Sequence, residues 1–222
     1  MSILGPLLFA YALGCISFAA LVGRWKGVDV RKHGSGNPGA TNVGRLLGKR
    51  WGRTVLVLDV LKGLLPVLLL AVPPSIFDAG GHVPVALAVV LGHVWPVTSR
   101  FRGGKGVATF VGAALALEWR AALAAMLVHV AVKRLTGYVS VASVAMAWSF
   151  PALLAGGRLI GWPLGLPAGS AAGPTAWRDG LLLLCLLALV VTLRHAGNFV
   201  RIRAGTEHRA GQRIPLERLD KS

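Results

Sequence analysis

Long apolar runs alternate with short polar segments along the whole chain. Five runs are clear: 2–23, 53–72, 82–98, 137–155 and 178–193. Their lengths are close to the roughly 20 residues that an α-helix needs to cross a bilayer. The pattern predicts an all-α membrane protein whose helices are joined by polar loops.

A sixth apolar stretch, 107–132, is too long for one span and carries Glu118 and Arg120 at its middle. Charged side chains are costly in lipid. We therefore expect two shorter helices that meet at "EWR", which gives a bundle of about seven transmembrane helices. A shallow, partly inserted hairpin is the alternative. The Gly/Pro/Ala-rich stretch 156–177 is expected to be a connector outside the membrane.

The positions of lysine and arginine indicate how this bundle is oriented. If the N-terminus lies outside, the inward-facing segments are 24–53, 99–106, 133–136 and 194–222, and they hold twenty of the 24 lysines and arginines. Positively charged loops stay on the cytoplasmic side. The charges therefore predict an N-terminus outside and a C-terminus in the cytoplasm. No basic residue precedes the first run, so we expect a retained helix there and no signal peptide.

Composition supports a single membrane domain over 1–222. The chain is 55% hydrophobic and 14% charged, with a mean hydropathy of +0.65 and a net charge of +16. The basic residues interrupt apolar stretches instead of lining a soluble face, so we expect no nucleic-acid partner. The two cysteines, Cys15 and Cys185, lie in apolar runs and are expected to be buried thiols without a disulfide.

Three polar segments, 32–45, 92–110 and 194–209, meet on the cytoplasmic side in this topology. Each combines glycines with His and basic residues, and the first and third also contain Asn. Glycine lets backbone N–H groups come close to a ligand, and arginine and lysine bind phosphate. The segments predict a phosphate site. "GGKG" fails the Walker A pattern, because Ser99 stands at its first glycine and Gly106 where Ser or Thr should follow the lysine, so we exclude an ATPase.

Taken together, "GSGNPGATN" with Arg45, "GH..P......GGKGVAT" and "H..N..R...GTE" resemble the three motifs of the bacterial acyl-phosphate–glycerol-3-phosphate acyltransferase family. "LDVLKG" at 58–63 also resembles a family segment. The departures are modest: Trp95 replaces the usual Phe, Arg102 a common Lys, and a Thr-Ser pair stands at 98–99. The likeness extends from the first helix to the tail.

The resemblance implies a multi-pass protein of the bacterial inner membrane with its active-site loops on the cytoplasmic face. Such a protein moves a fatty acyl group from acyl phosphate to the 1-hydroxyl of glycerol 3-phosphate, giving lysophosphatidic acid and phosphate, without a covalent acyl-enzyme. It uses no cofactor and no metal. Its partners would be acyl phosphate, glycerol 3-phosphate, membrane lipids and the soluble enzyme that makes acyl phosphate.

The motifs supply the candidate site residues. The catalytic candidates are Ser35, Arg45, His195 and Asn198. The substrate-binding candidates are Gly34, Gly36, Asn37, Thr41, Asn42, His93, Gly103, Gly104, Lys105 and Gly106. The structural candidates are Asp59, Lys62 and Glu207, of which the first two are three apart on one helix face and can neutralise each other.

Several of these roles stay open at the level of the sequence. Asn37 either binds a ligand or forms a turn before Pro38. For His93, a structural role and a functional role are equally well supported. Glu207 is better explained as an arginine partner that orders the third segment than as a catalytic base.

Two other functions are compatible with basic, glycine-rich loops. A transporter of anions or lipid phosphates would need polar residues through the middle of the bundle, where only Asp59 and Lys62 stand. A scaffold that binds anionic lipids would not need Ser35, Asn37 or Asn198 beside the charges. The three motifs together favour the enzyme.

Overall fold

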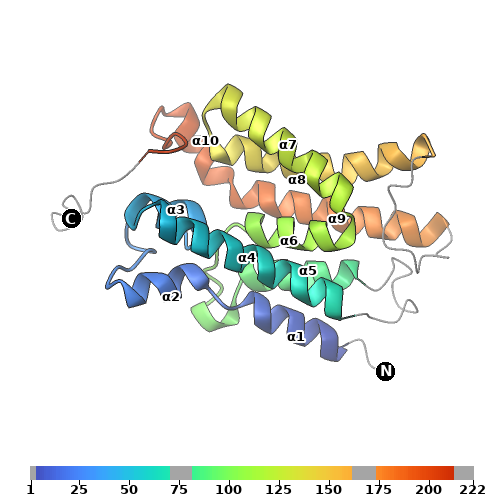
Figure 1. Cartoon of the computed structure of the whole chain (residues 1–222), viewed down its shortest axis with the longest axis horizontal. Helices are drawn as coiled ribbons and strands as arrows, with labels where there is room; N and C mark the ends of the chain where they lie inside the picture. The colour runs from blue at the N-terminus through green and yellow to red at the C-terminus, as the bar shows by residue number, and fades with distance from the viewer. Residues whose placement is uncertain (1–3, 71–81, 162–173, 213–222) are drawn as a thin grey trace.

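The structure is a computed structural model of the chain and describes residues 4–70, 82–161 and 174–212 (Figure 1). In chain order its elements are α1 (Leu4–Gly14), α2 (Phe18–Trp25), α3 (Ala40–Leu46), α4 (Lys49–Leu69), α5 (Val83–Val94), the 3-10 helix η1 (Val97–Ser99), α6 (Val107–Leu117), α7 (Trp119–Thr136), α8 (Val139–Leu159), α9 (Pro174–Arg194) and α10 (Ala196–Arg203). In these residues every regular element is a helix, which confirms the predicted all-α class.

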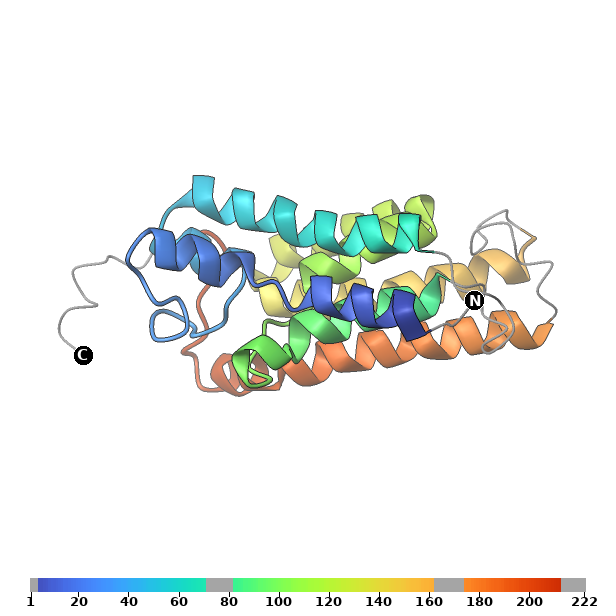
Figure 2. The same ribbon diagram turned by 90° about the horizontal axis from the view of Figure 1, so that it is seen from below.

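The long helices lie side by side and roughly parallel, as Figures 1 and 2 show. α4 packs along α6, α7 along α8, and α1 along α5. Glycine makes the α4–α6 contact close. A Cβ on Gly112 would lie 1.9 Å from the Val60 carbonyl oxygen, and one on Gly63 would lie 2.1 Å from that of Thr109. Small residues allow this backbone approach between membrane helices.

The outer surface of the bundle is apolar. Leucines such as Leu68, Leu127 and Leu182 are exposed on the long helices, and a large exposed apolar surface suits contact with lipid. Within the described residues, Leu4–Trp25 and Val139–Leu159 are long and apolar enough to cross a membrane, and the bent pair of α9 and α10 adds a third if it is one span. The total of seven spans and the orientation of the termini stay predictions.

The first apolar run is long enough for one span, but its helix is interrupted between α1 and α2. α1 ends at Gly14, and α2 begins after Ser17, whose hydroxyl accepts a hydrogen bond from the Ala20 amide at 3.3 Å. The Ile16 carbonyl instead accepts a 2.6 Å hydrogen bond from the Lys62 ammonium of α4. In a continuous helix the Ile16 carbonyl would accept a hydrogen bond from an amide of the same helix. Here it bonds to a side chain of α4 instead.

The expected break at "EWR" is confirmed. α6 ends at Leu117 and α7 begins at Trp119. The Glu118 carboxylate accepts a 2.7 Å hydrogen bond from the Ala121 amide and caps α7, while its other oxygen accepts one from Arg120 at 3.0 Å. An N-cap carboxylate satisfies an otherwise free amide of the first turn.

Other boundaries differ from the apolar runs. α4 begins at Lys49, before the run at 53, and the end of that run at 71–72 lies outside the described residues. The connector expected over 156–177 is shorter, because α8 continues to Leu159 and α9 begins at Pro174. α3 and α10 form inside polar segments, where apolar periodicity gives no signal.

Candidate active site

The three polar segments gather at one end of the bundle, on the left in Figure 1, where α2, α3 and α10 lie. Direct hydrogen bonds join the second segment to the third, and another joins α3 of the first segment to the tail after α10. The prediction that the motifs meet is confirmed.

The Asn42 side chain holds the first loop in shape. Its amide oxygen accepts a 2.9 Å hydrogen bond from the Ser35 amide, and its nitrogen donates to the carbonyls of Val30 at 2.8 Å and His33 at 3.0 Å. Gly36 has a φ of +68°, which favours glycine. Asn42 thus makes three bonds within the loop, and this geometry assigns it to loop support. No hydrogen bond occupies the Ser35 hydroxyl within the described residues.

Arg45, in the last turn of α3, connects the first motif to the tail. Its Nη2 donates to the His208 carbonyl at 3.2 Å, while its Nε is buried and has no hydrogen-bond partner among the described residues. Burial lowers the pKa of the guanidinium, against the opposing effect of Glu207. An unused buried donor of this kind is available to a ligand.

The second loop has no room for side chains at Gly103 and Gly104. A Cβ on Gly104 would lie 2.2 Å from Nε2 of His93, and one on Gly103 would lie 2.1 Å from the His93 carbonyl oxygen. Arg194 holds the loop from its other side, because its Nη2 and Nε donate to the carbonyls of Gly103 at 3.0 Å and Gly104 at 3.2 Å. Gly106 has a φ of +80° where α6 begins.

A chain of polar side chains joins the second and third motifs. The Lys105 ammonium donates to the Asn198 amide oxygen. The Asn198 nitrogen donates to one oxygen of Glu207 at 2.6 Å, and Arg201 donates to the other at 2.8 Å. Glu207 therefore orders the third segment, which matches its expected role as an arginine partner.

The pKa of the Lys105 ammonium is lowered toward the neutral range. Burial is the main cause that lowers the pKa of its ammonium to about 8; Arg201 and Arg45 act in the same direction, and Glu207 opposes them. A phosphate placed beside Lys105 would supply the negative charge that this cluster lacks.

His195 lies at the bend between α9 and α10. Its Nδ1 is 2.7 Å from the Val191 carbonyl oxygen, and since a carbonyl only accepts, Nδ1 carries the proton. Burial, reinforced by the Lys105 charge, lowers the pKa of His195 to about 4. The imidazole is therefore neutral at pH 7, with an unprotonated Nε2 that can accept a proton or a hydrogen bond.

A buried network of Asp59, Lys62 and His93 packs against the second loop. Lys62 forms an ion pair with Asp59 at 3.0 Å, which confirms that these residues pair with each other. The His93 Nδ1 lies 3.7 Å from the same carboxylate oxygen, and its ring packs under Gly104. The buried position of His93 suits a support for the loop better than direct contact with a ligand.

Two site residues were given no role in the sequence analysis, although both lie in the third polar segment. Arg194 grips the glycine loop and Arg201 binds Glu207. Arg201 is the arginine of the motif "H..N..R...GTE" and follows Asn198 by three residues, so the motif and a shared helix face were the available signals. Of the expected residues, Asn37 makes no side-chain hydrogen bond within the described part of the chain, and Thr41 is exposed in the first turn of α3. In the described part of the chain, no cluster of His, Cys, Asp or Glu could hold a metal ion.

An apolar helical bundle with a cationic, glycine-lined site at one end defines a membrane protein that handles an anionic ligand. Residues 4–205 match the family model described as glycerol-3-phosphate acyltransferase. A glycerol-3-phosphate acyltransferase of Myxococcus xanthus is 43% identical over 91% of this chain and 97% of its own, and one of Aquifex aeolicus is 38% identical over 94% and 100%. The chain belongs to the glycerol-3-phosphate acyltransferase family.

Solved structures agree with this assignment. The chain resembles crystal structures of PlsY (YgiH), an integral membrane glycerol 3-phosphate acyltransferase. The glycerol 3-phosphate form has a TM-score of 0.77 and 34% identity and covers 100% of both chains. The lysophosphatidic acid form has a TM-score of 0.76 and 36% identity over 95% of this chain and 96% of its own.

Proposed function

We propose that this protein transfers a fatty acyl group from acyl phosphate to the 1-hydroxyl of glycerol 3-phosphate, giving 1-acylglycerol 3-phosphate and phosphate. One observation carries the proposal: the Lys105–Asn198–Glu207 chain lies beside Arg45, whose buried Nε is unused. The names and forms of the PlsY structures, which include glycerol 3-phosphate and lysophosphatidic acid, support the same acceptor and product.

Lys105, Arg45 and Asn198 are the groups we assign to the phosphate of glycerol 3-phosphate. The two cations, Lys105 and Arg45, offset the charge of the phosphate, and a hydrogen bond from the Asn198 amide orients it. The backbone amides around Gly103, Gly104 and Gly106, which bear no side chains, suit the close approach of a second phosphate. Gly34, Gly36, Asn37 and Thr41 complete the binding surface from the first loop.

Acyl transfer from a mixed anhydride needs positioning more than a strong base. The hydroxyl oxygen of the acceptor attacks the acyl carbon, the bond from that carbon to the phosphate oxygen breaks, and the hydroxyl proton ends on the released phosphate. Holding both substrates in one site removes most of the entropic barrier. No covalent acyl-enzyme is required, and no metal takes part in this scheme.

Ser35 and His195 are placed to assist this step. Ser35 has a free hydroxyl on a loop fixed by Asn42, so it can donate to the developing oxyanion. His195 offers an unprotonated Nε2 and can align the attacking hydroxyl. Glu207 acts through Asn198 and Arg201 by ordering the tail.

The surroundings of the site suit a lipid product. We infer a multi-pass protein of the bacterial inner membrane, one domain over 1–222, with the site on the cytoplasmic face and the acyl chain among apolar helices. A soluble enzyme that makes acyl phosphate would be its supplier.

Donor choice tests this proposal. Purified protein in detergent is given glycerol 3-phosphate with palmitoyl phosphate, palmitoyl-coenzyme A or palmitoyl-acyl carrier protein. We expect product only with palmitoyl phosphate, and no hydroxylamine-sensitive acyl-protein during turnover. Ser35→Ala should lose activity, because the developing oxyanion loses a hydrogen-bond donor. Turnover with a thioester donor, or a trapped acyl-enzyme, would refute the donor and the direct transfer respectively.

A further inference from the structure

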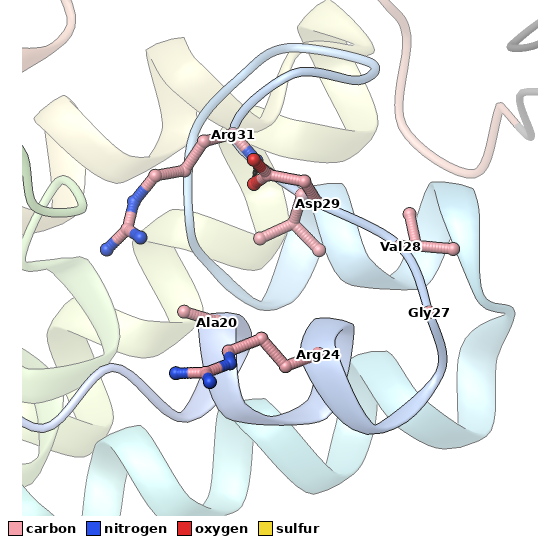
Figure 3. Close-up of a pocket in the computed structure, with 7 residues that line it drawn as sticks. Ala20, Arg24, Gly27, Val28, Asp29 and Arg31 are labelled. Atoms are coloured by element: carbon pink, nitrogen blue, oxygen red, sulfur yellow. Dashed lines mark hydrogen bonds between the residues drawn. The ribbon is translucent and has the colours of Figure 1, made fainter.

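A second cationic cavity lies outside the cluster just described, between α2 and the segment that leads into the first loop (Figure 3). It has a volume of about 350 Å³ and is lined by Ala20, Arg24, Gly27, Val28, Asp29, Val30 and Arg31. None of these residues has a role in the transfer scheme. We name it the Arg24–Arg31 pocket.

Two arginines dominate its charge. The side chains of Arg24 and Arg31 extend to the same side of the pocket in Figure 3. Among the described residues, neither guanidinium makes a hydrogen bond or an ion pair. Asp29 lowers the net charge of the lining but forms no ion pair with either arginine among the described residues; its Oδ1 accepts a 3.0 Å hydrogen bond from the Arg31 backbone amide. The pocket therefore presents two guanidinium groups that are available to bind a phosphate.

The walls are fixed and connected to the catalytic loop. α2 approaches the wall closely at Gly23, where a Cβ would lie 2.6 Å from the Val28 carbonyl oxygen. The Val30 carbonyl accepts a hydrogen bond from Asn42, the same side chain that holds the Ser35 amide. A ligand in the pocket thus lies one side chain away from the loop that carries Ser35.

An aromatic and cationic cluster beside the pocket places it at the membrane surface. Trp25 and Trp51 meet edge to face with ring centroids 4.9 Å apart, and the Lys26 ammonium lies 4.2 and 4.7 Å from those centroids. Tryptophan and lysine concentrate at the level of lipid headgroups. Leu21 and Trp25 are exposed on α2 and can contact lipid.

We propose that the Arg24–Arg31 pocket is a second binding site for the terminal phosphate of a single-chain membrane lipid. A phosphate monoester carries a charge of about −1.5 to −2 at pH 7 and matches two guanidinium groups better than the single charge of a phospholipid diester. This inference rests on the proposed function, since acyl phosphate and lysophosphatidic acid both have this chemistry. The pocket would hold one of them on its way to or from the catalytic loop.

Kinetics of the double variant Arg24→Gln/Arg31→Gln test the pocket. The charge-matched control is Arg134→Gln/Arg158→Gln, which removes two exposed arginines in the last turns of α7 and α8. Loss of the two contacts should raise the KM for palmitoyl phosphate, or the inhibition constant for added lysophosphatidic acid, by about tenfold. A raised KM would identify acyl phosphate as the ligand of the pocket, and a raised inhibition constant would identify lysophosphatidic acid. The kcat and the KM for glycerol 3-phosphate should stay within about twofold of native. If neither constant changes relative to Arg134→Gln/Arg158→Gln, the inference is wrong.

A photoactivatable alkyl phosphate, which cannot be turned over, tests the pocket independently of activity. In phosphatidylcholine nanodiscs it should label residues 20–31 of the native protein, and labelling should fall about tenfold in the double variant. Equal labelling of the two proteins overturns the inference even if the enzyme proves inactive. Equal competition by phosphatidylglycerol would overturn the choice of a monoester. An inactive native protein with labelled 20–31 would refute the proposed function and leave the pocket standing.

Discussion

At the scale of single residues, Lys105 connects the candidate site. Lys105 lies in the glycine loop and donates a hydrogen bond to Asn198 of α10. The charges of Glu207, Arg201 and Arg45 act on its pKa. Because its pKa is lowered to about 8, its charge depends on pH in the range where the protein would work. A phosphate ligand would favour the protonated form.

The pH dependence of acceptor capture follows from Lys105. Below pH 8 the ammonium is charged and binds phosphate; as the pH rises through about 8, the charge is lost. We therefore expect kcat/KM for glycerol 3-phosphate to fall above about pH 8. Lys105→Arg should move this alkaline limb upward by more than about one pH unit, because a guanidinium stays protonated. A limb at the same pH in that variant would contradict the assignment.

Glu207 is expected to tune Lys105 as well as order the tail. The Glu207 charge raises the pKa of Lys105, so Glu207→Gln should shift the alkaline limb to lower pH. It should also lower kcat/KM by about tenfold, since Arg201 loses a charged partner. Glu207→Asp keeps the charge and serves as the control. An unchanged limb in Glu207→Gln would show that Glu207 acts on structure alone.

The sequence predicted the members of this cluster better than their bonds. Motif spacing was enough to bring Lys105, Asn198 and Arg45 into one site. The hydrogen bonds from Arg194 to two backbone carbonyls could not be predicted from the sequence. Every residue has a carbonyl, and only the tertiary structure determines which carbonyls contact a side chain. The support roles of Asn42 and His93 also required coordinates.

At the scale of elements, glycine positions decide how closely the helices pack. The break at Glu118 was predictable, since two charges stand in an apolar run and the carboxylate caps the next helix. The break after Gly14 was not, because the Lys62 bond to the Ile16 carbonyl comes from another helix.

Gly112→Ala tests the α4–α6 contact. Its Cβ would lie 1.9 Å from a backbone oxygen that cannot rotate away, so the helices must separate. We expect a loss of about 1–3 kcal/mol in the free energy of unfolding, seen as a lower Tm in detergent. Gly156→Ala in α8 meets nothing within 4 Å and should keep or slightly raise the Tm. Equal Tm values for both variants would contradict this packing.

At the scale of the whole molecule, the structure separates an apolar bundle from a polar end. The α7–α8 turn lies at the polar end, because the Ala210 amide donates to the Gly137 carbonyl at 2.9 Å. Charge distribution predicted that this end faces the cytoplasm. Helix lengths alone do not fix the number of spans, since several described helices are shorter than a bilayer crossing.

Cysteine labelling tests the orientation. In a Cys15→Ala/Cys185→Ala background, single cysteines are placed at Arg134, at the end of α7, and at Arg158, in the last turn of α8; both arginines are exposed. A membrane-impermeant maleimide should label position 158 in intact cells and position 134 only after lysis. The opposite pattern would invert the proposed topology.

The most direct test of the account is the coupled yield of both products by the purified protein. After subtraction of the protein-free hydrolysis of palmitoyl phosphate, palmitoyl phosphate and glycerol 3-phosphate should give 1-palmitoylglycerol 3-phosphate and phosphate in equal amounts, with neither formed when glycerol 3-phosphate is left out. Lys105→Met should lower the rate by about 100-fold or more while remaining folded. Folded native protein that yields no acylated glycerol 3-phosphate, or that releases phosphate without the acceptor, would contradict the central claim.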